Sequence, residues 1–190
     1  AKGILTAVIN GGSAPNITLE GNLSVTVTAG ASNDIGALAG RAFETEISTI
    51  TNLAIINVNT DRIVDVGGIV GSSSNSQIAY SSNYGPVNVA VGEVSSTYSY
   101  RAGGIVGAIS AVNSSTNSIS YSYNATSVLA GYVDTAGTSD DSEEHSALST
   151  APGNYYVGGV VGHSNVKTLT IDHCYNSGAI RSGNKSNGVD

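Results

Sequence analysis

The 190-residue chain has little charge and few residues suited to special chemistry. Charged residues are 11% of it, against roughly a quarter of a typical soluble domain. The formal net charge is −7 and the seven lysines and arginines are scattered singly, which argues against nucleic acid as a partner. Tryptophan and methionine are absent, and the single cysteine, Cys174, excludes an internal disulfide framework.

Long hydrophobic runs are also missing. No stretch approaches the roughly 18 apolar residues of a membrane-spanning helix, because Gly, Asn and Ser interrupt the longest candidates, so we expect no membrane span. The sequence begins at Ala1 rather than Met and shows no charged-then-apolar leader. This start is typical of a mature chain or an excised fragment and favours a secreted or cell-surface location.

What the chain does contain is a repeated glycine motif. It reads "IGALAG" (35–40), "VGGIVG" (66–71), "AGGIVG" (102–107) and "VGGVVG" (157–162). A second piece follows each copy, with the pattern I-x-x-small-x-N-x-x-x-[V/I]. Its β-branched, aromatic and hydroxyl residues favour strands, and Gly or Asn recur where turns need a positive φ. The first glycines are 31, 36 and 55 residues apart, so the last interval holds an insertion near 131–153.

Repeats of this size predict an all-β fold, a parallel β-solenoid, with a right-handed β-helix as the expected form. One unit cannot bury its apolar face alone, whereas stacked copies share a continuous core. Equivalent side chains then form rows, and the conserved spacing predicts an amide ladder of four asparagines. The ladder consists of Asn52, Asn83, Asn124 and Asn176. Cys174 shares its repeat position with Ser81 and Ser122, which favours a packed thiol over a reactive one.

Three regions follow from the repeats. Residues 1–34 contain alternating stretches that read as N-terminal strands leading into or capping the solenoid. Residues 35–183 carry the repeats, and 184–190 form a C-terminal tail without an apolar cap. Uncapped ends expose backbone donors and acceptors, so we expect self-association through the solenoid ends or the N-terminal strand.

The combination of GG-[IV]-V-G with I-x-x-C-Y-N-x-G-x-[VI], clearest at 158–180, resembles the GLUG repeat. That repeat is found in bacterial and archaeal secreted and surface proteins, including adhesin-like proteins and the non-catalytic part of certain immunoglobulin A peptidases. The resemblance covers about 35–183 and implies a secreted β-solenoid-like module without a conserved active site or a particular ligand. The degenerate first copy and the long insertion depart from a regular array.

Candidate sites for chemistry are few. The glycine motifs match neither the Walker sequence nor the dinucleotide fingerprint, so phosphate binding is unsupported. The acidic stretch 134–145 could offer oxygen ligands to calcium, although its spacing does not match an EF-hand loop and a solvated insertion is favoured. No other cofactor is indicated. The calcium candidates are Asp140, Asp141, Glu143 and Glu144.

Catalysis is not expected. Asp172, His173 and Cys174 are neighbours in sequence, but successive residues of a strand point to opposite faces, so a catalytic Cys-His pair is disfavoured. The carboxylates of the repeats do not recur at one position, which argues against an acid-base pair for sugar cleavage. These carboxylates are Glu44, Glu46, Asp61, Asp65, Glu93 and Asp172.

Two further features concern glycans. Ten tyrosines could pack in rows, which is favoured, or stack on sugar rings. Those just before glycine motifs, where a surface row could form, are Tyr98, Tyr100, Tyr155 and Tyr156. Five sequons mark where glycans could attach if the host adds them. They are Asn16, Asn22, Asn113, Asn124 and Asn184.

Together these observations predict a non-enzymatic extracellular structural protein, a subunit of a cell-surface or filamentous assembly. The first alternative is an adhesin module that binds a glycan or another surface protein of a host or partner. The second is a carbohydrate-active β-helix enzyme, since parallel β-helices also host polysaccharide lyases and hydrolases.

Overall fold

The computed structural model describes residues 17–28, 33–91, 98–110, 116–132 and 153–182. These ranges contain 22 strands and no helix, and every strand pairing is parallel. With no helix in the described ranges, no segment there is a candidate for a membrane-spanning helix. The all-β parallel solenoid expected from the repeats is confirmed.

The strands group into five successive turns of the chain, which we call rungs 1 to 5. Rung 1 has β1 (Ile17–Leu19) and β2 (Asn22–Val27). Rung 2 has β3 (Asn33–Gly36), β4 (Ala39–Phe43), β5 (Glu46–Ser48), β6 (Ile50–Asn52) and β7 (Ile55–Thr60). Rung 3 has β8 (Val64–Gly67), β9 (Val70–Ser74), β10 (Gln77–Ala79), β11 (Ser82–Asn83) and β12 (Val87–Val91). Rung 4 has β13 (Ser99–Gly103), β14 (Val106–Ile109), β15 (Asn117–Ser120), β16 (Tyr123–Asn124) and β17 (Val128–Tyr132). Rung 5 has β18 (Asn154–Gly158), β19 (Val161–Ser164), β20 (Leu169–Asp172), β21 (Tyr175–Asn176) and β22 (Ile180–Ser182).

Each strand hydrogen-bonds to its equivalents in the rungs above and below, which produces five sheets. We number them by their first strand. Sheet 1 is β1-β6-β11-β16-β21, sheet 2 is β2-β7-β12-β17-β22, sheet 3 is β3-β8-β13-β18, sheet 4 is β4-β9-β14-β19 and sheet 5 is β5-β10-β15-β20. Residues 17–27, predicted to lead into the solenoid, form part of its wall, because β1 and β2 pair in register with β6 and β7.

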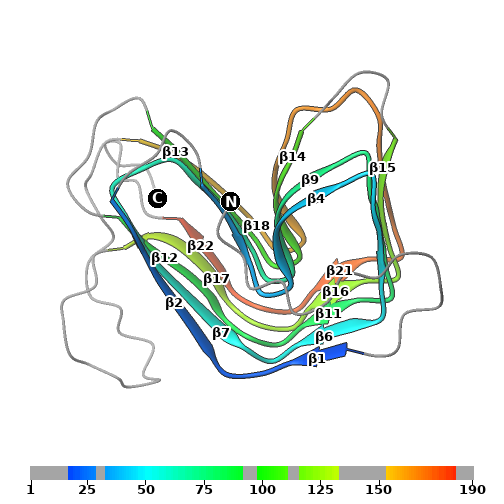
Figure 1. Cartoon of the computed structure of the whole chain (residues 1–190), viewed down its shortest axis with the longest axis horizontal. Coiled ribbons are helices and arrows are strands. Elements are labelled where there is room, and N and C mark those ends of the chain that lie inside the picture. The colour runs from blue at the N-terminus through cyan, green and yellow to red at the C-terminus, as the bar shows by residue number, and fades with distance from the viewer. Residues whose placement is uncertain (1–16, 29–32, 92–97, 111–115, 133–152, 183–190) are drawn as a thin grey trace.

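Viewed along the stack, the wall folds inward between sheets 3 and 4, so the cross-section has two lobes (Figure 1). We call this inward fold the notch. The glycine motif forms its tip, because "VGGIVG" ends β8, turns and begins β9. The motif is therefore the point where each rung bends back into its own interior.

Glycine is required at the tip of the notch. A Cβ added at Gly104 would overlap the carbonyl oxygen of Gly159 in the next rung and the side chain of Asn124. Gly68 and Gly159 face Asn83 and Asn176 in the same way. The small residue thus lets the notch reach the asparagine column on the opposite wall.

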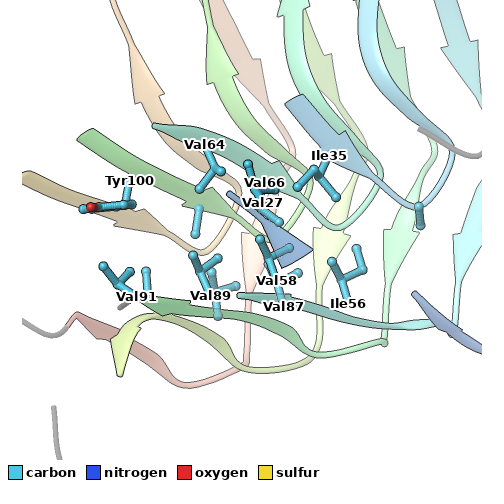
Figure 2. Close-up of a cluster of buried hydrophobic side chains, with 14 residues drawn as sticks. Val27, Ile35, Ile56, Val58, Val64, Val66, Val87, Val89, Val91 and Tyr100 are labelled. Carbon is cyan, nitrogen blue, oxygen red and sulfur yellow. The ribbon is translucent and has the colours of Figure 1, made fainter. Parts of the chain in front are cut away.

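The notch divides the interior into two apolar cores. The first lies between sheets 2 and 3, where alternate residues such as Val64 and Val66 point inward and meet Val87 and Val89 (Figure 2). The second is enclosed by sheets 4, 5 and 1 and includes Ile69, Ile78, Ile105 and Ile119. The aliphatic columns of both cores run through successive rungs, as stacking of repeats requires.

Candidate functional site

The four predicted ladder asparagines form one column in sheet 1. Asn52 donates to Oδ1 of Asn83 at 2.7 Å, Asn83 donates to Asn124 at 2.8 Å, and Asn124 donates to Asn176 at 2.6 Å. The first three side chains are fully buried. Leu19 occupies the same column in rung 1, so the ladder starts at rung 2. Its role is structural, because each amide hydrogen bond joins two successive rungs in sheet 1, opposite the tip of the notch.

The amides also fix the turn that follows them. The Nδ2 of Asn52, Asn124 and Asn176 donates to the carbonyl oxygen two residues further along the chain, at 3.1, 2.6 and 2.7 Å. Asn124 lies in a sequon, but its buried amide nitrogen already donates two hydrogen bonds. A glycan therefore cannot attach there in the folded chain.

Charged groups meet in the notch. Asp34, Asp65 and Arg101 occupy one column of sheet 3, on the face opposite the first core. Arg41 reaches across from sheet 4, and its Nε and Nη2 lie 2.7 and 2.5 Å from Oδ2 of Asp34. Nη1 of Arg101 lies 3.0 Å from Oδ1 and 3.2 Å from Oδ2 of Asp65. The two arms of the notch are thus joined by an ion pair.

We call these four residues, Asp34, Arg41, Asp65 and Arg101, the notch cluster. Its two carboxylates are almost fully buried. Asp65 is 6% exposed at its side chain and Asp34 is 3% exposed. Burial raises the pKa of Asp65 to about 6, with Arg101 opposing the rise and the neighbouring Asp34 adding to it. Oδ1 of Asp34 is buried without a hydrogen-bond partner. Because an arginine covers each carboxylate, neither is open to a polymeric substrate.

The sequence-based view that no carboxylate recurs at one repeat position was wrong for this pair. Asp34 lies 31 residues before Asp65, the same spacing as between the first two glycine motifs, and the two residues are in register. The alignment missed them because it began at Ile35. The Asp34–Asp65 pair does not support the hypothesis of a carbohydrate-active enzyme, because the two groups of an acid-base site must reach the substrate.

Exposed aromatic rings form two rows on sheet 1 and on the corner before it. In the corner row, Tyr80 stacks on Tyr121 at 5.0 Å between ring centroids, and Tyr121 stacks on His173 at 4.8 Å. In the sheet row, Tyr123 and Tyr175 stack at 4.8 Å, and the Tyr84 hydroxyl meets that of Tyr123. Stacked neighbours cover the faces of the inner rings, so the rows mainly present ring edges and hydroxyls to solvent.

The corner row is held in an unusual backbone conformation. Tyr80, Tyr121 and His173 have φ of 49°, 47° and 49°, and Thr49 at the same corner of rung 2 has φ of 57°. A non-glycine residue at positive φ costs of order 1 kcal/mol or more, so the repeated turn imposes this conformation. Sequence reasoning missed the row because aromatic residues at this position break the usual Gly or Asn rule for such turns.

The tyrosines that the sequence singled out occupy another environment. Tyr100 is fully buried and stacks on Tyr155 inside the first core, and Tyr98 packs against the same core. Burial raises the pKa of Tyr100. Tyr156 faces the notch, where its ring meets His163, whose pKa is lowered by burial and by Arg101. These four residues form no continuous surface row.

The sequence neighbours Asp172, His173 and Cys174 make separate contacts in the structure. Nδ1 of His173 lies 2.8 Å from Oδ2 of Asp172, while the imidazole stacks on Tyr121. The Cys174 thiol packs against the second core and donates to the carbonyl oxygens of Asp172 and Ile119, at 3.3 and 3.5 Å. No hydrogen bond links the thiol to the imidazole, so a nucleophile and base are not paired here.

The remaining predicted sites are only partly described. Asn22 is exposed at the start of β2, where its Oδ1 accepts from Asn57 at 3.3 Å. The described residues contain no group of three or more His, Cys, Asp or Glu that could hold a metal ion. Several predictions lie outside the described ranges: the calcium candidates Asp140, Asp141, Glu143 and Glu144, the sequons Asn16, Asn113 and Asn184, and the carboxylate Glu93.

The C-terminal end of the solenoid is open along β20, β21 and β22, because no described strand pairs with their outer edges. Ile180 is 38% exposed and Ile171 is 49% exposed. Their equivalents one rung earlier, Val128 and Ile119, are fully buried. These three strands of rung 5 therefore offer both unpaired backbone groups and apolar side chains to another chain.

Comparison with known proteins adds no relative to this description. No family model, no curated protein and no solved structure matches the chain.

Proposed function

We propose that the chain is a non-enzymatic extracellular structural protein, a β-solenoid subunit that joins other chains end to end in a cell-surface or filamentous assembly. The observation that carries the proposal is the open edge of β20, β21 and β22 in rung 5. A row of unpaired strand edges is a template for pairing with another chain unless it is blocked. In the described part of rung 5 no proline or bulge blocks it.

The surface chemistry supports a structural role. Outside the notch cluster the wall carries many small, hydroxyl and amide side chains beside its tyrosines, and the buried acidic groups are paired with arginine. The low charge and the resemblance of the repeats to the GLUG repeat support an extracellular location. A chain that presents a rigid wall and an adhesive end is suited to building an extended structure.

An adhesin module is the second candidate, and the exposed aromatic rows favour it. Tyr80, Tyr121 and Tyr175 are about half exposed and lie on one side of the solenoid. The terminal ring of each row leaves a face open, on which a sugar could stack. A glycan array tests this candidate: loss of signal in Tyr175→Ala would support it, and no signal for the wild type would reject it.

Light scattering over a concentration series tests the assembly proposal. The weight-average mass of the wild type should rise with concentration, and Ile180→Lys should lower it to that of a monomer, because a charge at the open core opposes burial. Ile55→Lys is the matched control, since Ile55 is equally exposed, at 39%, but points outward from rung 2. A wild type that stays monomeric from micromolar to millimolar concentration would reject the proposal.

A further inference from the structure

We propose that the assembly is polar and in register: β21 and β22 of one copy pair in parallel with β1 and β2 of a second copy, head to tail. This inference rests on the proposed function, because it specifies which ends meet when copies associate. It identifies the second copy as the partner of the open edge and assigns residue pairs across the joint.

The spacing of the strands supports this match. Leu23 follows Leu19 by four positions in rung 1, and Ile180 follows Asn176 by the same four positions in rung 5. Within the chain, Leu19 and Leu23 already pair with the equivalent positions Asn52 and Ile56. The β1–β2 unit thus has the turn length and register of a rung, and it would continue sheets 1 and 2 beyond β21 and β22.

At two positions of the joint, apolar side chains of β1 and β2 would meet the Cys174 thiol and the Ile180 side chain. Ile17 and Leu23 point inward and are only partly buried, because β1 and β2 lie at the first edge of their sheets. At the other end, the Cys174 thiol is partly buried and Ile180 is exposed. In the proposed register Leu23 of the second copy covers Ile180, which continues the aliphatic column of sheet 2, and Ile17 covers the Cys174 thiol in sheet 1.

Charge favours contact between opposite ends over contact between like ends. The described residues from 17 to 62 carry five acidic and two basic side chains, whereas those from 153 to 182 carry one acidic and two basic side chains. A head-to-tail joint places the acidic end beside the basic end, and a tail-to-tail joint would bring two copies of Lys167 and Arg181 together.

The asparagine ladder makes the joint weaker than the contacts between rungs. In the proposed register Asn176 meets Leu19 of the second copy, so the amide column is interrupted at every joint. Each contact between successive rungs from rung 2 to rung 5 has an amide bond of this ladder that the joint lacks. The assembly should therefore dissociate on dilution while each subunit stays folded.

Cysteine cross-linking tests the register directly. Cys174 is the single cysteine of the chain, and Ile17→Cys would place a second thiol beside Cys174 of the neighbouring copy. Strands in a sheet lie about 4.8 Å apart, within the Cα separation that a disulfide spans. Inside one copy the two positions are four rungs apart, roughly 19 Å, so an internal bond cannot form.

The expected result is a ladder of covalent multimers when Ile17→Cys is oxidised at concentrations where the wild type associates. Thr18→Cys is the matched control: it lies next in the same strand but points outward, so it should give no ladder. A second pair, Leu23→Cys with Ile180→Cys in a Cys174→Ser background, tests the same joint in sheet 2 if Ile17→Cys does not fold.

The remaining outcomes separate this inference from the proposed function. Covalent dimers of the wild type through Cys174 would show a tail-to-tail joint and overturn the polarity. Association by light scattering without any ladder from either pair would overturn the register while leaving the structural role intact. Absence of association in every sample would reject both.

Discussion

Asp65→Asn should remove a fall in stability between pH 4 and pH 7. The pKa of Asp65 is raised from 3.8 to about 6 in the folded chain, chiefly by burial in the notch. The folded state therefore holds the proton more tightly than the unfolded state. The contribution of this group is fully present below about pH 4 and is lost as the pH rises through 6.

The size of the effect follows from the shift. A difference of about two pKa units corresponds to roughly 3 kcal/mol, of which about 2 to 3 kcal/mol falls between pH 4 and pH 7. Urea unfolding at several pH values should show the wild type losing this much relative to Asp65→Asn. Replacing Asp65 also frees Arg101 from its partner, so the pH dependence, and not the stability at one pH, is the informative quantity.

Glu46→Gln is a suitable control, because it removes a carboxylate that is exposed on β5 and lies outside the notch. Carbon chemical shifts of the Asp65 carboxyl would report the titration directly. Parallel profiles for the wild type and Asp65→Asn, or a midpoint near 4, would show that Arg101 offsets the burial and would refute the reasoning.

The remaining predictions concern stability, each measured by urea unfolding at pH 7. Asn83→Ala should cost about 2 to 4 kcal/mol, because it leaves buried amide groups on two neighbouring rungs without their partners, whereas Asn88→Ala in the outer pair with Asn57 should cost less than about 1 kcal/mol. Equal costs would contradict a special role for the buried ladder. Gly104→Ala should prevent folding or cost several kcal/mol, since its Cβ would overlap backbone of the next rung, whereas Gly21→Ala meets no atom and should cost about 1 kcal/mol for its positive φ. A mild Gly104→Ala phenotype would show that the notch can relax. Tyr100→Phe should be neutral or stabilise by about 1 kcal/mol, because the Tyr100 hydroxyl is buried without a partner. A clear loss of stability would show that the hydroxyl is satisfied.

Much of the wall could be predicted from the sequence, because one repeated spacing governs it. The positions of Asn52, Asn83, Asn124 and Asn176 in the sequence imply a common column, and parallel stacking at constant register delivers that column. The alternation of Val64 and Val66 likewise indicates one inward face. These features depend on pairing between neighbouring rungs, which the period alone determines.

The shape of the cross-section was not predictable in the same way. The glycine motif indicated a tight turn, but only the structure shows that the turn points inward and ends against Asn83 and Asn124. The ion pair between Asp34 and Arg41 depends on that inward fold, since it joins two sheets across the notch. A contact between two sheets of the same rung, such as this ion pair, cannot be recognised from the repeats when the other rungs have different residues at those positions.

The aromatic surface illustrates the same limit. Tyr80, Tyr121 and His173 occupy the same position of the repeated pattern, so their common column follows from the sequence, but its exposure to solvent does not. Tyr100 and Tyr155 also share a column, yet they point into the first core. Whether a column points into a core or toward solvent depends on where it lies relative to the corners of the rung. The turns determine the positions of these corners, and the repeat period does not.

Electron microscopy of the purified wild-type chain tests the central claim most directly. The account predicts unbranched filaments one solenoid wide whose diffraction shows the strand repeat of about 4.8 Å along the filament axis. Their length should increase with protein concentration and decrease in Ile180→Lys. Single particles of one subunit at every concentration, with no filament or ladder, would contradict the account.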